Sequence, residues 1–146
     1  MLKKLRRLAE LSPGDWLLLF QLWLAALLML CVLRVLRLGR LTELIIAYAR
    51  HPGLKRVPLR LGCYPGARVE ALVDIASRMA HGQGECLLRS LLLLWLLHIR
   101  GERATLVIGV CKESAFLQAH AWIETEDGRI GGSPETIHRF APLLRL

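Results

Sequence analysis

Residues 81–99 read HGQGECLLRSLLLLWLLHI, and this stretch decides how the rest of the chain must be arranged. Gly82 and Gly84 break any helix that precedes them, and an apolar run then extends from Cys86 to Ile99 with few polar side chains. A helix that is apolar on nearly all sides has to be buried. The stretch therefore predicts a central core helix over residues 86–99.

A change of periodicity after this helix indicates strands. Residues 104–111 form a short segment that is rich in β-branched side chains. Along residues 115–125 the side chains alternate between two faces, so that His120 and Trp122 share one face. Asp127-Gly128 is a typical hairpin turn, and a return strand follows it. Helices followed by strands favour an α+β fold, in which an antiparallel sheet packs on the central helix.

Three further helices are predicted before the central one. Ser12-Pro13-Gly14-Asp15 combines a cap, a proline for the first helical position and an acid for the positive end of the dipole. The helices are expected over residues 16–33, 41–49 and 69–80. The one-sided apolar faces expected on the last two are Leu44, Ile45 and Tyr48, and Leu72, Ile75, Ala76 and Met79.

Composition and charge separate the N-terminal segment from the remainder. Hydrophobic residues make up 54% of the 146 residues, and the net charge is +8. Residues 1–40 hold seven basic and two acidic side chains, so five of the eight net charges lie there. The remaining residues have no basic stripe, which argues against a nucleic-acid partner. Three prolines and three glycines mark residues 51–66 as a linker between an N-terminal helical arm (1–50) and a core domain (67–146).

The apolar arm has two interpretations. Eighteen residues is the lower limit for a bilayer span, and basic residues flank residues 15–36 at both ends. We favour a helix that is buried or faces a partner, with membrane association through residues 15–36 as the alternative. The four cysteines are widely spaced and include no CxxC pair, so we expect a reduced, cytoplasmic chain without a cysteine-based metal site.

Cys86 and His120 are the candidate catalytic residues. A helix N-terminus carries unpaired N–H groups and a partial positive charge, and both stabilise a thiolate or an oxyanion. If the sheet packs on the helix, the His120 imidazole can accept the thiol proton. The alternative is a buried structural cysteine and a hydrogen-bonded core histidine. The other histidines lie beside helix ends or in the tail, and their spacing makes a metal site a weak hypothesis.

The same residues carry a resemblance to a known family, the transglutaminase-like leader peptidases of lasso-peptide biosynthesis. It runs from about Leu11 to Pro142 and includes the leucine-rich N-terminal helices. The motifs are Cys86-Leu87-Leu88-Arg89-Ser90-Leu91, then Gly101, Ile108-Gly109-Val110 and Phe116, then Ala119-His120-Ala121-Trp122-Ile123-Glu124. The combination of Cys-Leu-x-Arg-Ser-Leu with Ala-His-Ala-Trp is more specific than either motif alone.

This resemblance implies a fold, an activity and partners. The fold is a transglutaminase-like, papain-like core with the catalytic cysteine at the start of the central helix. The activity is a cysteine peptidase that removes the leader from a ribosomally made precursor peptide and needs no metal or organic cofactor. The sequence resembles the split form, in which a separate leader-binding protein recognises the precursor and a macrolactam synthetase acts afterwards. The apolar arm is then a candidate docking surface.

The third catalytic residue departs from the Cys-His-Asp pattern of the family. No Asp stands shortly after the turn that follows the histidine strand; Glu135 and the turn residue Asp127 are the candidates. A two-residue loop at Asp127-Gly128 would place His120 opposite Glu135, so we rank Glu135 first. Gln83 is a candidate oxyanion-hole donor, with a plain loop glutamine as the alternative. Acyl transfer to an amine and a non-catalytic membrane-anchored adaptor are the competing functions.

Overall fold

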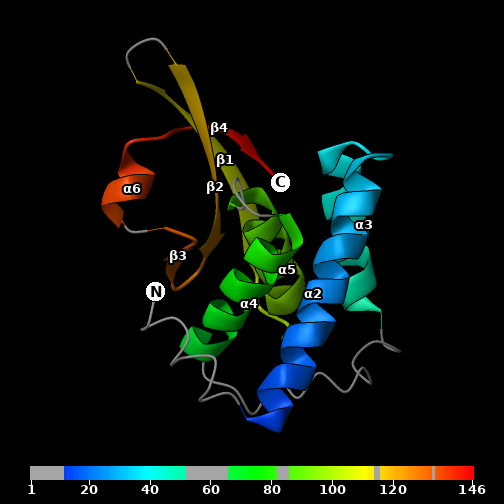
Figure 1. Cartoon of the computed structure of the whole chain (residues 1–146). Coiled ribbons are helices and arrows are strands. Elements are labelled where there is room, and N and C mark those ends of the chain that lie inside the picture. The colour runs from blue at the N-terminus through cyan, green and yellow to red at the C-terminus, as the bar shows by residue number, and fades with distance from the viewer. Residues whose placement is uncertain (1–11, 52–65, 82–85, 114–115, 133) are drawn as a thin grey trace.

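The computed structural model describes residues 12–51, 66–81, 86–113, 116–132 and 134–146. Helices cover one face of an antiparallel sheet, and a short helix lies on the other face (Figure 1). This confirms the predicted α+β class and the antiparallel sheet packed on helices. The elements are α2 (Pro13–Leu33), α3 (Leu38–Arg50), α4 (Gly66–His81), α5 (Cys86–Ile99), β1 (Ala104–Glu113), β2 (Phe116–Thr125), β3 (Gly128–Ile130), α6 (Pro134–His138) and β4 (Ala141–Arg145).

Helix α5 has the predicted bounds and is the centre of the core. Its leucines are buried on several sides, and α3, α4 and the β1–β2 hairpin pack around it. Arg100 and Gly101 end the helix, and Gly101 adopts a φ of 82°. The glycine is suited to this end because a left-handed residue is sterically free without a Cβ.

The sheet has the strand order β3-β2-β1-β4. Strands β1 and β2 form a long hairpin, in which Gly109 pairs with His120 and Val107 with Trp122. The following turn differs from the prediction: Thr125 pairs with Gly128, so the loop is Glu126-Asp127 and every expected partner shifts by two residues. Strand β3 also ends at Ile130, so the expected pairing of His120 with Glu135 is wrong.

Helices α2 and α3 join the same core as α4 and α5. Ser12 caps α2, as the sequence predicts. Its hydroxyl accepts a hydrogen bond from the Asp15 N–H, and the Asp15 carboxylate accepts one from the Ser12 N–H, which forms a capping box that was not predicted. Asp15 is buried and accepts a 2.8 Å hydrogen bond from Arg68 of α4. The Arg68 hydrogen bond lowers the pKa of Asp15 from its ordinary 3.8 to about 2, because it stabilises the carboxylate.

Two of the predicted helix faces need correction. In α3, Leu44 and Tyr48 are exposed, and the buried residues are Leu41, Thr42, Ile45 and Ala49. In α4, Met79 is exposed, and Val69, Val73 and Ser77 join Leu72 and Ala76 in the buried face. The reason is that each helix packs against a neighbour from a direction that the periodicity alone does not define. The linker expected over residues 51–66 lies almost entirely outside the described residues.

A second, smaller core lies on the sheet face away from α5. Trp122 is 1% exposed and packs with Val107, Ile137 and Phe140. Gly109 makes this packing possible, because a Cβ there would lie 2.7 Å from two Trp122 ring atoms. Helix α6, which no sequence signal predicted, contributes Ile137 to this second core, and the equally unpredicted strand β4 pairs with β1 at the far edge of the sheet.

Candidate active site

Cys86 is the first residue of α5, as the sequence predicts. Its side chain is half-buried and packs against the leucine core on the helical side of the sheet. The thiol is free, as are those of Cys31 and Cys111. The position combines partial exposure of the thiol with the first backbone N–H groups of a helix.

His120 lies in the middle of β2 with its ring on the opposite sheet face. The ring stacks at 6.3 Å from the Trp122 ring and lies 5.3 Å from that of Phe140. Its Nε2 atom is 3.2 Å from the carbonyl oxygen of Gly131. The ring is half-buried, and these three neighbours hold its plane.

The Gly131 contact decides which nitrogen of His120 carries the proton. A carbonyl oxygen only accepts hydrogen bonds, so Nε2 must be the donor. In the neutral imidazole the other nitrogen, Nδ1, then has a free lone pair. The backbone therefore prepares Nδ1 as the proton acceptor, which is the role that a general base needs.

Two consecutive glycines make this contact possible. Gly131 has a φ of 116°, and a Cβ on it would lie 3.3 Å from the Trp122 Cα. A Cβ on Gly132 would lie 3.1 Å from His120 Nε2 and 3.3 Å from an Ile137 carbon. Larger residues would push this segment away from the imidazole, so the glycine pair brings the accepting carbonyl to the ring.

The structure places Cys86 and His120 on neighbouring elements without joining them. Helix α5 packs on β2, but no hydrogen bond between the two side chains occurs among the described residues. Strand β3 pairs with Ile123–Thr125, so β1 is the only described strand beside β2 at His120. At this level the Gly131–Gly132 segment, rather than a paired strand, lies beside β2 and contacts the imidazole.

Polar groups next to Cys86 on α5 have an unexpected partner. Arg89 Nε lies 3.9 Å from an Asp74 carboxylate oxygen of α4, and Asp74 also pairs with Arg78. Glu124 of β2 pairs instead with Arg145 and accepts a hydrogen bond from Trp122. Arg89 Nε and Ser90 Oγ are buried, and neither has a hydrogen-bond partner among the described residues. Two buried polar atoms in the first two turns of α5 therefore lack a hydrogen bond from the described residues.

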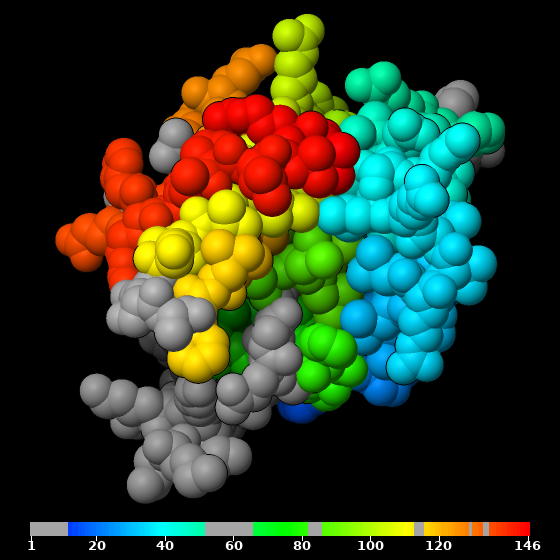
Figure 2. Space-filling view, turned by 90° about the horizontal axis from the view of Figure 1, so that it is seen from above, coloured from blue at the N-terminus to red at the C-terminus, as the bar shows by residue number. Residues whose placement is uncertain are grey.

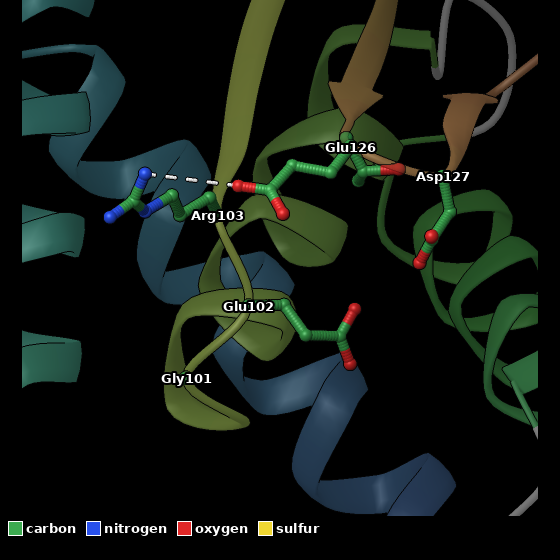
Figure 3. A pocket seen from close by; sticks show the side chains of 6 residues that line it. Gly101, Glu102, Arg103, Glu126 and Asp127 are labelled. Carbon is green, nitrogen blue, oxygen red and sulfur yellow. Dashed lines mark ion pairs between the residues drawn. The ribbon is translucent and has the colours of Figure 1, made fainter.

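Among the described residues, no hydrogen bond joins His120 to either candidate acid. Asp127 is in the hairpin turn and lines a hollow of about 490 Å³ with Glu102, Arg103 and Glu126 (Figure 3). Five residues of strand separate His120 from Thr125, which is roughly 17 Å at ~3.4 Å per residue, so Asp127 does not reach the ring. Glu135 is exposed in the first turn of α6. Gln83, the candidate oxyanion donor, lies outside the described residues.

Three contributors to the site were not singled out from the sequence. Gly131, Gly132 and Phe140 contact or accommodate the His120 ring. The Gly-Gly pair after the return strand is a visible signal, since consecutive glycines indicate close backbone approach. Phe140 gives no such signal, because its contact depends on the path of α6 across the sheet.

Comparison with known families agrees with this architecture. A model of the transglutaminase-like superfamily matches residues 25–145. The match covers most of the chain and includes the cysteine helix and the histidine strand, so the protein belongs to the transglutaminase-like superfamily. No curated protein and no solved structure matches the chain significantly.

Proposed function

We propose that the protein is a cysteine peptidase that removes the leader from a ribosomally made lasso-peptide precursor. Two observations support this proposal: a free cysteine at the start of the central helix, and a histidine on the neighbouring strand whose Nε2 atom lies 3.2 Å from a backbone carbonyl oxygen. The superfamily supports cysteine-based acyl chemistry. The specificity for a lasso-peptide leader rests on the Cys-Leu-x-Arg-Ser-Leu and Ala-His-Ala-Trp motifs.

The proposed reaction has two steps. The first requires the Cys86 thiol and the His120 ring, which lie on opposite faces of the sheet, to come together. His120 Nδ1 then accepts the Cys86 proton, and the thiolate attacks the carbonyl carbon of the last leader residue. The imidazolium then gives its proton to the amine of the core peptide as the C–N bond breaks, which leaves a thioester on Cys86. In the second step His120 accepts a proton from water, the resulting hydroxide displaces Cys86, and the leader leaves with a free carboxylate.

The α5 N-terminus and the Gly131 carbonyl have separate tasks in this scheme. The first backbone N–H groups of α5 stabilise the oxyanion that forms as the thiolate attacks. The Gly131 carbonyl keeps Nε2 protonated and stabilises the imidazolium, which is the work that the acid does in a Cys-His-Asp triad. Glu135 is the remaining side-chain candidate for that role.

The partners follow from the same proposal. The substrate is the precursor peptide, a separate leader-binding protein presents it, and the macrolactam synthetase consumes the released core. The chemistry on the peptidase itself uses no metal or organic cofactor. The reaction is expected in the cytoplasm, where the precursor is synthesised.

Cleavage of the cognate precursor in the presence of the leader-binding protein tests the proposal. Wild type, Cys86→Ala, His120→Ala and the control Cys111→Ala are compared by mass spectrometry. Cys111 is a matched control because it is also a free, half-buried thiol. We expect leader release by wild type and Cys111→Ala, and a loss of at least about a thousandfold in both site variants, since triad members act as a unit.

The product chemistry distinguishes hydrolysis from acyl transfer. In ¹⁸O-labelled water, hydrolysis places one heavy oxygen in the leader carboxylate, whereas transfer to an added amine yields an amide of different mass. Equal cleavage by wild type and Cys86→Ala would remove Cys86 from the mechanism. Folded wild type that cleaves nothing, with its partner present, would contradict the peptidase assignment.

A further inference from the structure

Helix α2 has two apolar faces, and the protein core uses only one of them. The buried face is directed at α4 and α5 and consists of Leu18, Leu19, Leu22, Ala26 and Met29. The other face, here called the α2 stripe, is exposed to between 52% and 65% and consists of Trp16, Leu17, Phe20, Leu24 and Leu28. In Figure 2, α2 and α3 form one side of the molecule, coloured blue to cyan.

The α2 stripe is a continuous surface. At 100° per residue its five members fall within about 120° of the helix circumference, and they extend over roughly 18 Å of helix length. Two of the five side chains are aromatic, and Phe20 contacts Trp23 at the border of the stripe with a centroid separation of 6.0 Å. Soluble monomers seldom expose an apolar surface of this extent, so the stripe is a candidate binding surface.

The core contacts of α2 are incompatible with a bilayer span. The helix has the length and hydropathy of a span, with a mean hydropathy of 2.4. However, Leu22 and Ala26 are fully buried against the other helices, and the buried Asp15 is held by Arg68 of α4. Insertion across a membrane would remove these side chains from the core and separate that ion pair. A folded protein can offer only the outer half of α2 to an apolar phase.

The charges around the stripe indicate the chemistry of that phase. From residue 16 to residue 42 the chain contains no acidic side chain. Arg34, Arg37 and Arg40 follow the stripe and are exposed, and Glu43 of α3 is the first acid after them. Lys3, Lys4, Arg6 and Arg7 precede α2 in the sequence, against Glu10. An apolar strip with basic ends complements anionic lipid headgroups above an acyl layer.

We propose that α2 attaches the protein to the surface of an anionic bilayer and lies parallel to the membrane plane. The stripe is immersed in the headgroup–acyl boundary, with Trp16 at interfacial depth, and the three arginines contact lipid phosphates. The buried face remains on the protein core, so the attached protein keeps its fold. This inference does not depend on the catalytic assignment.

Vesicle co-sedimentation of the full chain tests this attachment. The probes are vesicles of phosphatidylcholine alone and of phosphatidylcholine with 30% phosphatidylglycerol. We expect binding to the anionic vesicles that weakens with salt, and a blue shift of tryptophan emission that Trp16→Phe reduces. Leu24→Glu/Leu28→Glu should weaken binding by on the order of a hundredfold, at roughly tenfold for each leucine removed from the boundary.

Two further variants test whether vesicle binding depends on the α2 stripe and on its flanking arginines. Phe116→Glu/Leu117→Glu makes the same kind of change at apolar positions on the hairpin that are even more exposed, and it should leave binding unchanged. Arg34→Glu/Arg37→Glu/Arg40→Glu should abolish the preference for anionic vesicles. Circular dichroism confirms that each variant is folded. Absence of vesicle binding by the wild type, or a stripe that instead mediates self-association or binding to the leader-binding protein in solution, would overturn the proposal.

Discussion

His120 Nε2 donates a hydrogen bond of 3.2 Å to the carbonyl oxygen of Gly131, a residue eleven positions further along the chain. The contact gives Nε2 a backbone acceptor and leaves the Nδ1 lone pair of the neutral imidazole free. The contact depends on the absence of a Cβ at both Gly131 and Gly132. This glycine pair therefore determines which atom accepts the His120 proton.

Gly132→Ala should impair cleavage more than it impairs folding. The added Cβ would lie 3.1 Å from His120 Nε2, so the imidazole must turn or the Gly131 carbonyl must withdraw. We expect leader cleavage to fall about ten- to a hundredfold, because small displacements of a catalytic group have large kinetic effects. Single-turnover kinetics measure the effect. Gly66→Ala is the matched control, because a Cβ at Gly66 meets nothing within 4 Å; a comparable loss in this control would contradict the explanation.

Substitution of the two candidate acids should have small effects. Asp127→Asn leaves the imidazole unaffected, since the hairpin turn lies several residues beyond His120 along the strand. Glu135→Gln should keep at least about a third of kcat/KM, because the Gly131 carbonyl already accepts the Nε2 proton. The pH dependence of kcat/KM for both variants provides the measurement. A loss of a hundredfold or more in Glu135→Gln would restore Glu135 as the triad acid.

Gly109→Ala should destabilise the fold. A Cβ at this position would lie 2.7 Å from two Trp122 ring atoms and 2.9 Å from the Phe140 Cβ, on a face that is already fully packed. Overpacking of this kind costs roughly 1–3 kcal/mol. Urea titration followed by Trp fluorescence measures the change. Gly39→Ala, in the first turn of α3 with 4.0 Å of clearance, should be neutral or stabilising by comparison.

Asp15→Asn should destabilise the protein in a pH-dependent way. The carboxylate completes the capping box with Ser12 and binds Arg68, so its loss should cost roughly 1–3 kcal/mol at neutral pH. The folded-state pKa of about 2 lies below the ordinary 3.8, so the stabilisation is present above pH 3.8 and disappears as the pH falls towards 2. Urea unfolding of wild type and variant from pH 2 to 7 should show curves that converge at the acid end. A constant difference across this range would refute the ion-pair explanation.

The local signals in the sequence were sufficient for most elements. The Ser-Pro-Gly-Asp start of α2 and the bounds of α5 appear in the structure where their patterns place them. Along β2, Ala121 and Ile123 face one core and Trp122 the other, as the alternation predicts, although both faces are buried there. These features depend on capping, on continuous hydrophobicity and on a period of two, which neighbouring residues determine without distant partners. The alternation also placed His120 and Trp122 on one face, and the ring contact between them confirms this.

The register of the β2–β3 pair and the buried faces of α3 and α4 were harder to predict from the sequence. The Asp-Gly dipeptide predicted a loop one position later than the observed Glu126-Asp127, and the shift of two in every pair removed Glu135 from its expected place opposite His120. Periodicity likewise misplaced Leu44, Tyr48 and Met79 on buried faces. In both cases alternatives that differ by one or two residues have similar local energies, and tertiary packing selects among them.

The sequence by itself determined the chemical types and their local positions: a cysteine at a helix start, a histidine on an alternating strand, and an apolar helix with basic ends. Only the tertiary structure decided that the acceptor of the His120 proton is the Gly131 carbonyl, that Asp74 is the acid beside Arg89, and that one face of α2 is used by the core while the other is exposed. Each of these outcomes depends on contacts between segments far apart in the chain. Such contacts follow from the packing of complete elements, which no single stretch of sequence encodes.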